Sequence, residues 1–298
     1  MKKFMKGAAI TGGILLLVGI IVIFIGVTFG GAKDLSEKSI DDIASLSKMS
    51  KLTEMVDKVD GINFLDGITI SFGGTNFNAN VFDDGQEIYS DGTYTFEDMN
   101  ASNLEIVVGA GGLQVKYHDD EAVKMEVGSK DRMQCFVKGD TLIIRGGARE
   151  QINGGGDMVL YLPKNAVYND VLIDVGAGNF SADALSGENI TVEAGMGNVV
   201  INGADVWNVD VSVGMGNVEI EGEIKGDGII DCGMGQVTMN LVGNGKDFNY
   251  ELDCGMGSLD VEDVCSIAGI GDQSVDNKAS KRIEVSVGMG SVEVEFEE

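Results

Sequence analysis

From about Ile62 onward, apolar and polar residues alternate with period two in short runs that Gly, Asn and Asp separate. This pattern predicts short β-strands with one buried face, joined by turns. A Gly-x-Gly triplet interrupts the alternation six times, at intervals of 19, 19, 19, 22 and 33 residues. The triplet glycines are Gly176, Gly178, Gly195, Gly197, Gly214, Gly216, Gly233, Gly235, Gly255, Gly257, Gly288 and Gly290. Such an internal repeat predicts one supersecondary unit per repeat, each packed against its neighbours.

Two apolar positions precede each triplet and two follow it. The preceding rows are Ile173, Val192, Val211, Ile230, Leu252, Val285 and then Val175, Ala194, Val213, Cys232, Cys254, Val287. The following rows are Phe180, Val199, Val218, Val237, Leu259, Val292 and then Ala182, Ile201, Ile220, Met239, Val261, Val294. An odd spacing separates the apolar positions on either side of the triplet, so a straight strand could not bury both. The triplet is therefore predicted to be a bend, with glycine supplying the backbone freedom that a corner needs.

Strand–corner–strand units that stack at the ~4.8 Å interstrand distance predict an all-β fold, a parallel β-solenoid with coils of 19–22 residues. We expect this body to occupy residues 62–298. Residues 62–100 are read either as a first coil or as a separate cap. The 33-residue interval departs from the pattern, and we interpret 264–281 as an insertion that places Cys265 in a loop.

The N-terminus predicts a membrane anchor. Lys2, Lys3 and Lys6 precede an uncharged stretch over 7–32, which exceeds the ~20 residues needed to span a bilayer. We expect a transmembrane helix over 7–32 in a bacterial cell membrane, with residues 1–6 cytoplasmic and the body extracytoplasmic. A cleaved signal peptide is the alternative, with 30–32 as its small-residue cleavage site. Residues 33–61, rich in helix formers, are expected to form a juxtamembrane helical stalk without a heptad seam.

Charge limits the partners. The 298 residues include 21 Lys and Arg against 48 Asp and Glu, which gives a net charge of −27. This excludes nucleic acid as a partner, because binding to phosphate needs clustered Lys and Arg. The remaining candidates are a protein or a glycan at the cell envelope, besides the membrane itself.

The repeats, together with the apolar run at 158–163, resemble the bacterial "putative-adhesin" β-strand repeat family. Related toast-rack domains occur in membrane-bound envelope-stress regulators. The resemblance covers about 100–298 and implies a β-solenoid behind a membrane anchor. It implies no activity for individual residues.

Three sets of residues in the repeats are candidates for a site. The x positions form a row at the corner, which we interpret as a packed ladder, with a pliable interaction ridge as the alternative: Met196, Met215, Met234, Met256 and Met289. Cys232 and Cys254 share one inward position in coils expected to be neighbours; we favour two packed apolar residues over a disulfide or metal pair. The outward acids Asp174, Glu193, Asp231 and Asp253 are either a Ca²⁺ strip or a solvated face. The calcium-solenoid motif is missing, which favours the solvated face and no metal site.

Enzyme signatures are missing from the sequence. His118 is the single histidine and is expected in an acidic loop, and no phosphate-binding or dinucleotide motif is present. We therefore expect no enzyme and no cofactor, and a carboxylate-dependent glycan-active enzyme is the remote alternative. The expected function is a non-catalytic, membrane-anchored, adhesin-like module. The alternative is an envelope-stress sensor or regulator that acts through neighbouring membrane proteins.

Overall fold

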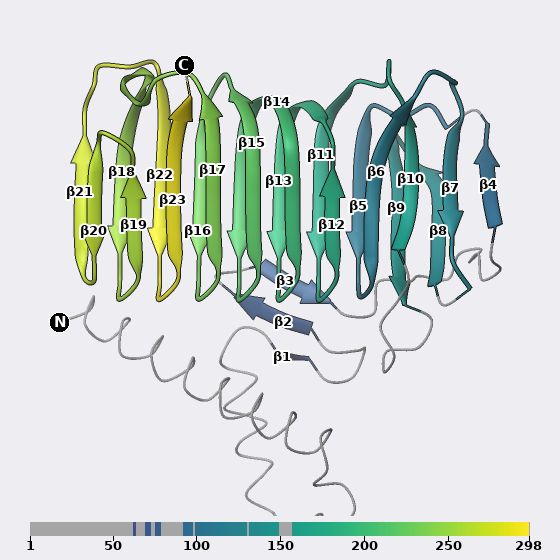
Figure 1. Ribbon diagram of the computed structural model, residues 1–298, viewed down its shortest axis with the longest axis horizontal. Helices are drawn as coiled ribbons and strands as arrows, with labels where there is room; N and C mark the ends of the chain where they lie inside the picture. Colours follow the sequence, from purple (N-terminus) through teal and green to yellow (C-terminus); the bar gives the residue numbers. More distant parts are fainter. Residues whose placement is uncertain are drawn as a thin grey trace, which may run out of the picture. The chain divides into compact units, whose positions relative to one another are not determined.

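The computed structural model describes residues 92–97, 99–129, 131–148 and 157–297, together with three short strands between 62 and 78 (Figure 1). The expected cytoplasmic segment 1–6, the anchor 7–32 and the stalk 33–61 lie outside the described residues. Within the described ranges, no helix has the length and apolar character needed to cross a membrane. The three short strands, β1 (Ile62–Asn63), β2 (Thr69–Phe72) and β3 (Thr75–Asn78), form a sheet of their own in which β2 and β3 are antiparallel.

The remaining strands form two ladders that enclose one hydrophobic core. The first ladder runs, in spatial order, through β8 (Asp131–Lys138), β9 (Thr141–Ala148), β5 (Asn103–Val108), β11 (Tyr168–Val175), β13 (Leu185–Ala194), the later half of β14 (Asn198–Val213), β16 (Gly228–Cys232), β22 (Lys281–Val287), β18 (Phe248–Cys254) and β21 (Gly271–Val275). The second ladder runs through β4 (Gly92–Phe96), β7 (Val123–Val127), β10 (Asp157–Pro163), β6 (Gly112–His118), β12 (Asn179–Ala182), the earlier half of β14, β15 (Asn217–Ile224), β17 (Gln236–Val242), β23 (Ser291–Glu297), β19 (Ser258–Val261) and β20 (Cys265–Ala268).

The register of the central strands repeats the sequence period. Val175 pairs with Ala194, and Ala194 pairs with Val213, each 19 residues further along the chain and each in a parallel strand. At every glycine triplet the chain passes from the first ladder to the second. We call one such strand–corner–strand unit a coil and name it by its residues, for example coil 228–242. The expected all-β fold is confirmed.

The core consists of the inward positions predicted from the alternation. All four apolar rows are buried, and none of their residues is more than 3% exposed. Because each coil contributes two inward positions on either side of its corner, the two ladders face each other across a layer of Val, Ile, Leu and Phe side chains. Removal of this apolar surface from water is the main favourable term in the fold.

The order of the coils in space differs from their order in the sequence. Coil 281–297 lies between coil 228–242 and coil 248–261, so that Ile283 pairs with Gly228 on one side and with Tyr250 on the other. This corrects the expected insertion over 264–281. Much of that segment forms strands β20 and β21, which extend the two ladders as antiparallel neighbours of β19 and β18. Cys265 therefore begins a strand instead of lying in a loop.

This order accounts for the two irregular intervals of the repeat. The connection over 243–247, which contains the 3-10 helix η2 (Gly245–Asp247), leads to a coil two ladder positions away. It needs more residues than the tight connection over 183–184 between β12 and β13, which joins neighbouring coils. The opposite end of the stack has the same arrangement, because coil 103–118 lies between strands β9 and β10 on one side and coil 168–182 on the other.

The coil order also separates two cysteines. Val287 stands between Cys232 and Cys254 in the inward row, so the two are not in neighbouring coils as the sequence suggested. Two ladder spacings amount to about 10 Å, beyond the Cα separation that a disulfide bridges. The structure has all four cysteines as free thiols. Packing as small apolar side chains is the role that this geometry gives to Cys232 and Cys254.

The core analysis predicts a contrast between two aromatic residues. Phe180 is 1% exposed and Trp207 is 58% exposed. Phe180→Ala should lower the free energy of unfolding by ~3–5 kcal/mol, because it leaves a cavity among the stacked coils. Trp207→Ala, the matched control, should change it by less than about 0.5 kcal/mol. Urea unfolding followed by circular dichroism measures both, and equal losses for the two variants would contradict the assignment of the core.

Candidate interaction surfaces

The glycine corner is the most regular feature of the surface, and its geometry has a steric cause. A Cβ atom placed on Gly178 would lie 2.6 Å from the carbonyl oxygen of Gly111, and on Gly216 or Gly235 it would lie even closer to the carbonyl of the preceding corner. Real Cβ atoms do not approach an oxygen below 3.0 Å. The second glycine of each triplet is therefore required by the close stacking of backbone on backbone.

This finding corrects the expected reason for the glycines. The described glycines with positive φ are Gly92, Gly111, Gly139, Gly222, Gly243 and Gly269. None of them belongs to the six triplets. The corner therefore uses the small size of glycine and does not use its access to left-handed backbone conformations.

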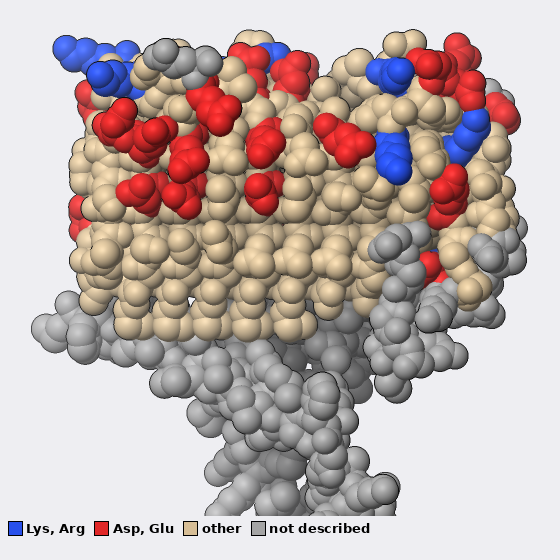
Figure 2. Space-filling view, in the orientation of Figure 1, with Lys and Arg blue, Asp and Glu red and all other residues tan. Residues whose placement is uncertain are grey.

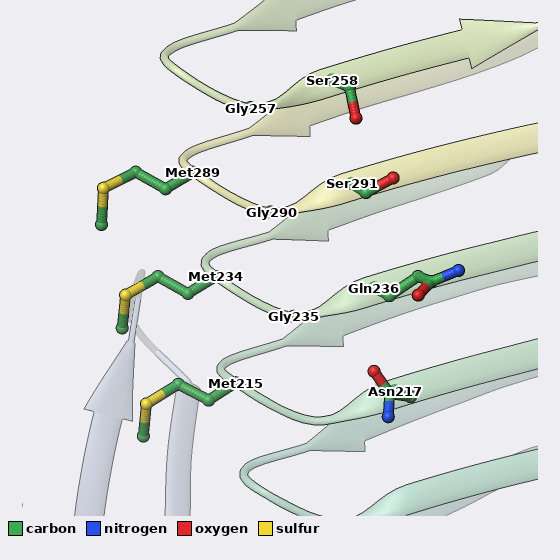
Figure 3. Close-up of a pocket in the computed structure, with 10 residues that line it drawn as sticks. All are labelled: Met215, Asn217, Met234, Gly235, Gln236, Gly257, Ser258, Met289, Gly290 and Ser291. Carbon is green, nitrogen blue, oxygen red and sulfur yellow. The ribbon is translucent and has the colours of Figure 1, made fainter.

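Backbone hydrogen bonds continue through the corner and place the methionines in a row. The amide of Met215 donates to the carbonyl of Gly195 at 2.7 Å, and the amide of Met289 donates to that of Gly233 at the same distance. The side chains of Met215, Met234 and Met289 lie one above another and point away from the ladders (Figure 3). Met196 and Met256 continue the row and are exposed, whereas the three between them are half-buried. The predicted row exists, with Met289 placed between Met234 and Met256.

A row of uncharged polar side chains runs beside the methionines on the second ladder. The Asn198 amide donates to the Asn179 side chain at 3.0 Å, and the Asn217 amide donates to the Asn198 side chain at 2.9 Å. Gln236, Ser291 and Ser258 continue the row. A shallow depression of about 580 Å³ lies between the two rows in the last coils (Figure 3).

Charged side chains are unevenly distributed on the face shown in Figure 2. Over the stacked coils they gather on the parts of the strands far from the corner, and the band beside the corner carries no Lys, Arg, Asp or Glu. The methionine row and the polar row together make up this uncharged band. This band therefore differs chemically from the rest of that face, whereas on the first ladder Asp174, Glu193, Asp231 and Asp253 lie two residues before their triplets.

The predicted acidic strip lies on the outer face of the first ladder. Its residues share one row, in the spatial order Asp174, Glu193, Ser212, Asp231, Ser286, Asp253 and Asp272. Ser212 and Ser286 separate the carboxylates, so only the pairs at the two ends of the row are direct neighbours. Among the residues that the structure describes, no group of three or more His, Cys, Asp or Glu is arranged to hold a metal ion.

Burial and neighbouring negative charges raise the pKa values of carboxylates in this row. Asp174 is half-buried, and burial, followed by the charges of Glu193 and Glu105, raises its pKa to about 7. Its Oδ1 atom is buried and accepts no hydrogen bond from the described part of the chain. Burial and then Asp210 raise the pKa of Glu193 as well. The row therefore holds a proton at a pH where an ordinary aspartate has lost it.

A second depression, of about 500 Å³, lies on the same acidic face. Ile229, which is 43% exposed, is surrounded there by carboxylates. They are Asp231, Glu251, Asp253, Asp272 and Glu284. The sequence analysis missed this cluster, because Glu284 takes its place between Ile229 and Glu251 only through the insertion of coil 281–297.

A second amide ladder marks the opposite end of the first-ladder strands. The Asn189 amide donates to Asp170 at 2.8 Å, the Asn208 amide donates to Asn189 at 2.9 Å, and the backbone N–H of Asp227 donates to Asn208 at 2.9 Å. These residues recur every 19 positions, so the signal was present in the sequence although the analysis of the triplets passed over it. The ladder satisfies polar groups at the second corner of each coil.

His118 packs against residues of an acidic turn and a neighbouring strand. It is the last residue of strand β6 and does not lie in a loop as expected. Its Nδ1 atom is 3.5 Å from Asp120 Oδ2, and its ring packs edge-on against Tyr161. These contacts tie the imidazole to the acidic turn and give no support to a catalytic role.

Comparisons with known proteins identify relatives of the domain. A family model described as "Toastrack DUF4097" matches residues 98–296. None of the curated proteins matches the sequence. Similar solved structures include a "putative cell adhesion protein" from Clostridium sporogenes, which is 17% identical in sequence; the match covers 70% of this chain and 99% of that chain, with a TM-score of 0.36. A "putative adhesin" from Bacteroides fragilis is 13% identical, and the match covers 70% of this chain and 97% of that chain, with a TM-score of 0.40. A "putative lipid binding protein" from Parabacteroides distasonis is 12% identical, covers 72% of this chain and 98% of its own, and has a TM-score of 0.32.

The steric role of the corner can be tested with two glycines of the same coil. Gly235→Ala should lower the free energy of unfolding by ~1–3 kcal/mol or more, because its methyl group meets backbone that cannot move aside. In Gly228→Ala the new Cβ atom lies 3.5 Å from its nearest neighbours, which is ordinary contact, so this control should lose much less stability. Denaturant unfolding compares the two, and an equal loss would show that glycine is needed for another reason.

The acidic row predicts how stability depends on pH. The pKa of Asp174 is about 7 in the folded chain against 3.8 for an ordinary aspartate, so the folded state binds this proton more tightly than the unfolded state. The resulting stability is present at low pH and is lost as the pH rises through about 7. Asp174→Asn should raise the melting temperature at pH 8 and flatten its fall between pH 5 and 8. Asp183→Asn, at an exposed turn, is the control, and an unchanged slope in Asp174→Asn would contradict the assignment.

Proposed function

Because the chain belongs to the Toastrack DUF4097 family over residues 98–296, we propose that it is a non-catalytic module of the bacterial cell envelope that binds its partner through the glycine corner. The uncharged band along that corner is the observation that carries the proposal. It combines a methionine ridge with a row of amides and hydroxyls over successive coils. The family supports the envelope module, and the surface supports the place of contact.

The composition of the band supports a role in binding. Interface centres are depleted of charged residues and enriched in methionine. Methionine side chains are flexible and polarisable, so a row of them adapts to an irregular partner. The neighbouring Asn, Gln and Ser side chains offer hydrogen-bond donors and acceptors at each coil spacing. A neutral protein surface or an uncharged glycan fits this chemistry.

The net charge of the protein further restricts the chemical class of the partner. With a net charge of −27, the molecule repels phosphate-rich polymers and other polyanions at long range. On the face shown in Figure 2, the band beside the corner is the part of the surface where a neutral partner meets no carboxylate. The acidic remainder keeps the body soluble and directs association to the corner.

We place the module outside the cell on a single-span anchor. The uncharged segment 7–32 is long enough to cross a bilayer, and Lys2, Lys3 and Lys6 favour a cytoplasmic N-terminus. The short segment 33–60 would reach roughly 40 Å as a helix at 1.5 Å per residue. A body held so close to the membrane also favours the second candidate, an envelope-stress regulator that contacts neighbouring membrane proteins.

In-cell crosslinking of the full-length tagged protein tests the proposal. A photoreactive residue at Met215 should capture a partner, and replacement of Met196, Met234 and Met289 by Gln should reduce capture at least about tenfold, since hot-spot losses exceed ~1 kcal/mol each. Ile229→Gln, an exposed apolar residue on the acidic face, is the matched control and should leave capture unchanged.

The captured material separates the two candidates. Wall or matrix polymer supports the adhesin-like module, whereas one stoichiometric membrane protein supports the regulator. Capture that is insensitive to the methionine substitutions would contradict the corner as the contact surface.

A further inference from the structure

Coil 281–297 is inserted between two coils that precede it in the sequence, and it pairs with both. In the first ladder, Val285 pairs with Ile230 on one side and with Leu252 on the other. In the second ladder, Val292 pairs with Val237 and with Leu259. Its corner glycine, Gly290, packs on the carbonyl of Gly235. The coil therefore fills a slot whose two walls are formed by earlier parts of the chain.

Only residues 276–280 connect this coil to the preceding hairpin of β20 and β21. The segment has no strand pairing, and Lys278 in its centre has a φ of 57°, which is uncommon for a residue with a side chain. It is held to β18 by side-chain hydrogen bonds, in which Asn277 donates to the Phe248 carbonyl at 2.8 Å and Asn249 donates to the Ala279 carbonyl at 2.8 Å. The connection crosses from β21 over β18 to β22, which is about 10 Å at the usual strand spacing. Fully extended, its six Cα–Cα steps would span about 20 Å. The tether therefore has the length to carry the coil outside its own slot.

The two coils that flank coil 281–297, which are 228–242 and 248–261, carry apolar side chains at the same inward positions as coil 281–297 itself. Ile230 and Leu252 occupy the same inward row, and so do Val237 and Leu259. Coil 248–261 also precedes coil 281–297 during synthesis, so the two walls are able to pair before the inserted coil exists. If coil 281–297 were absent, coils 228–242 and 248–261 could pair directly with each other, and neither would keep an unpaired edge.

The outward-facing acidic row favours the arrangement in which coil 281–297 lies between coils 228–242 and 248–261 over direct pairing of those two coils. Ser286 lies between Asp231 and Asp253 and interacts with the Asp231 carboxylate by a side-chain hydrogen bond. Closure would bring Asp231 and Asp253 into neighbouring positions, where like charges repel. A coil in the slot keeps them two positions apart. Any chain that supplies residues 281–297 satisfies this requirement, whether it is the same chain or another copy.

We infer that coil 281–297 is exchanged between two copies of this protein, each copy filling the other's slot. The contacts in the slot are identical in the exchanged and unexchanged forms, so the two differ only in the tether and in the cost of association. This inference is independent of the proposed corner contact, because it uses the strand edges inside the stack and leaves the methionine row unoccupied.

Cysteine pairs in the outward row test the exchange. One full-length copy carries Ser286→Cys and a second, differently tagged copy carries Asp231→Cys, at two exposed neighbouring positions. After co-expression and mild oxidation, we expect a disulfide between residues 231 and 286 that joins the two tags. It should double the apparent mass in a reducible way, and peptide mapping by mass spectrometry should identify the linked residues.

Two controls make the result decisive. The pair Ser212→Cys and Glu193→Cys occupies the same row in interior coils that cannot leave the stack, so it should join no two copies. A chain that carries both Ser286→Cys and Asp231→Cys should likewise form the bond between two copies, because each coil 281–297 lies in the other copy's slot; a bond within one chain would show that the coil fills its own slot. The inference is overturned if this single-chain bond forms while the two-copy experiment yields monomers. It is equally overturned if the interior pair links copies as readily.

Discussion

Close stacking of one glycine corner on the carbonyl of the next is the contact on which the rest of this structure depends. It brings successive coils to backbone contact, and the amides of the corner then continue the parallel ladders without a break. With the corners in contact, the register of 19 residues follows on both ladders. The register in turn aligns every inward row into the core and every outward row into a line of equivalent side chains.

Stacking of equivalent side chains in a line stabilises the structure where the side chains are amides and destabilises it where they are carboxylates. Stacked amides stabilise one another, as in the chain of hydrogen bonds from Asn217 through Asn198 to Asn179. Stacked carboxylates repel, and the half-buried Asp174 responds with a raised pKa. The two serines in the acidic row reduce this repulsion by separating carboxylates. One stacking geometry thus produces both a neutral corner and an acidic face, and the proposed binding surface lies on the neutral side.

The similarity of the coils also explains how the chain can place one coil between two others that follow each other in the sequence. Coils that share the same inward pattern and the same corner present similar edges, so coil 281–297 pairs equally well with a preceding coil on either side. The connections then decide the order. Longer segments, such as 243–247 and 276–280, reach past a neighbour, whereas tight turns between other coils do not. Interleaving at both ends of the stack gives the terminal coils partners on both sides, and antiparallel hairpin strands cover the outermost edges.

Much of this protein was predictable from local patterns. Period-two alternation determines which side chains point inward, and an odd spacing across Gly-x-Gly determines the bend, so the four buried rows and the methionine row followed from the sequence alone. The steric reason for the glycines, the separation of Cys232 from Cys254 and the cluster around Ile229 did not. These features depend on which coil lies beside which. Repeats with the same inward residues leave that choice open, and only the packing of the whole chain, with the reach of its connections, decides it.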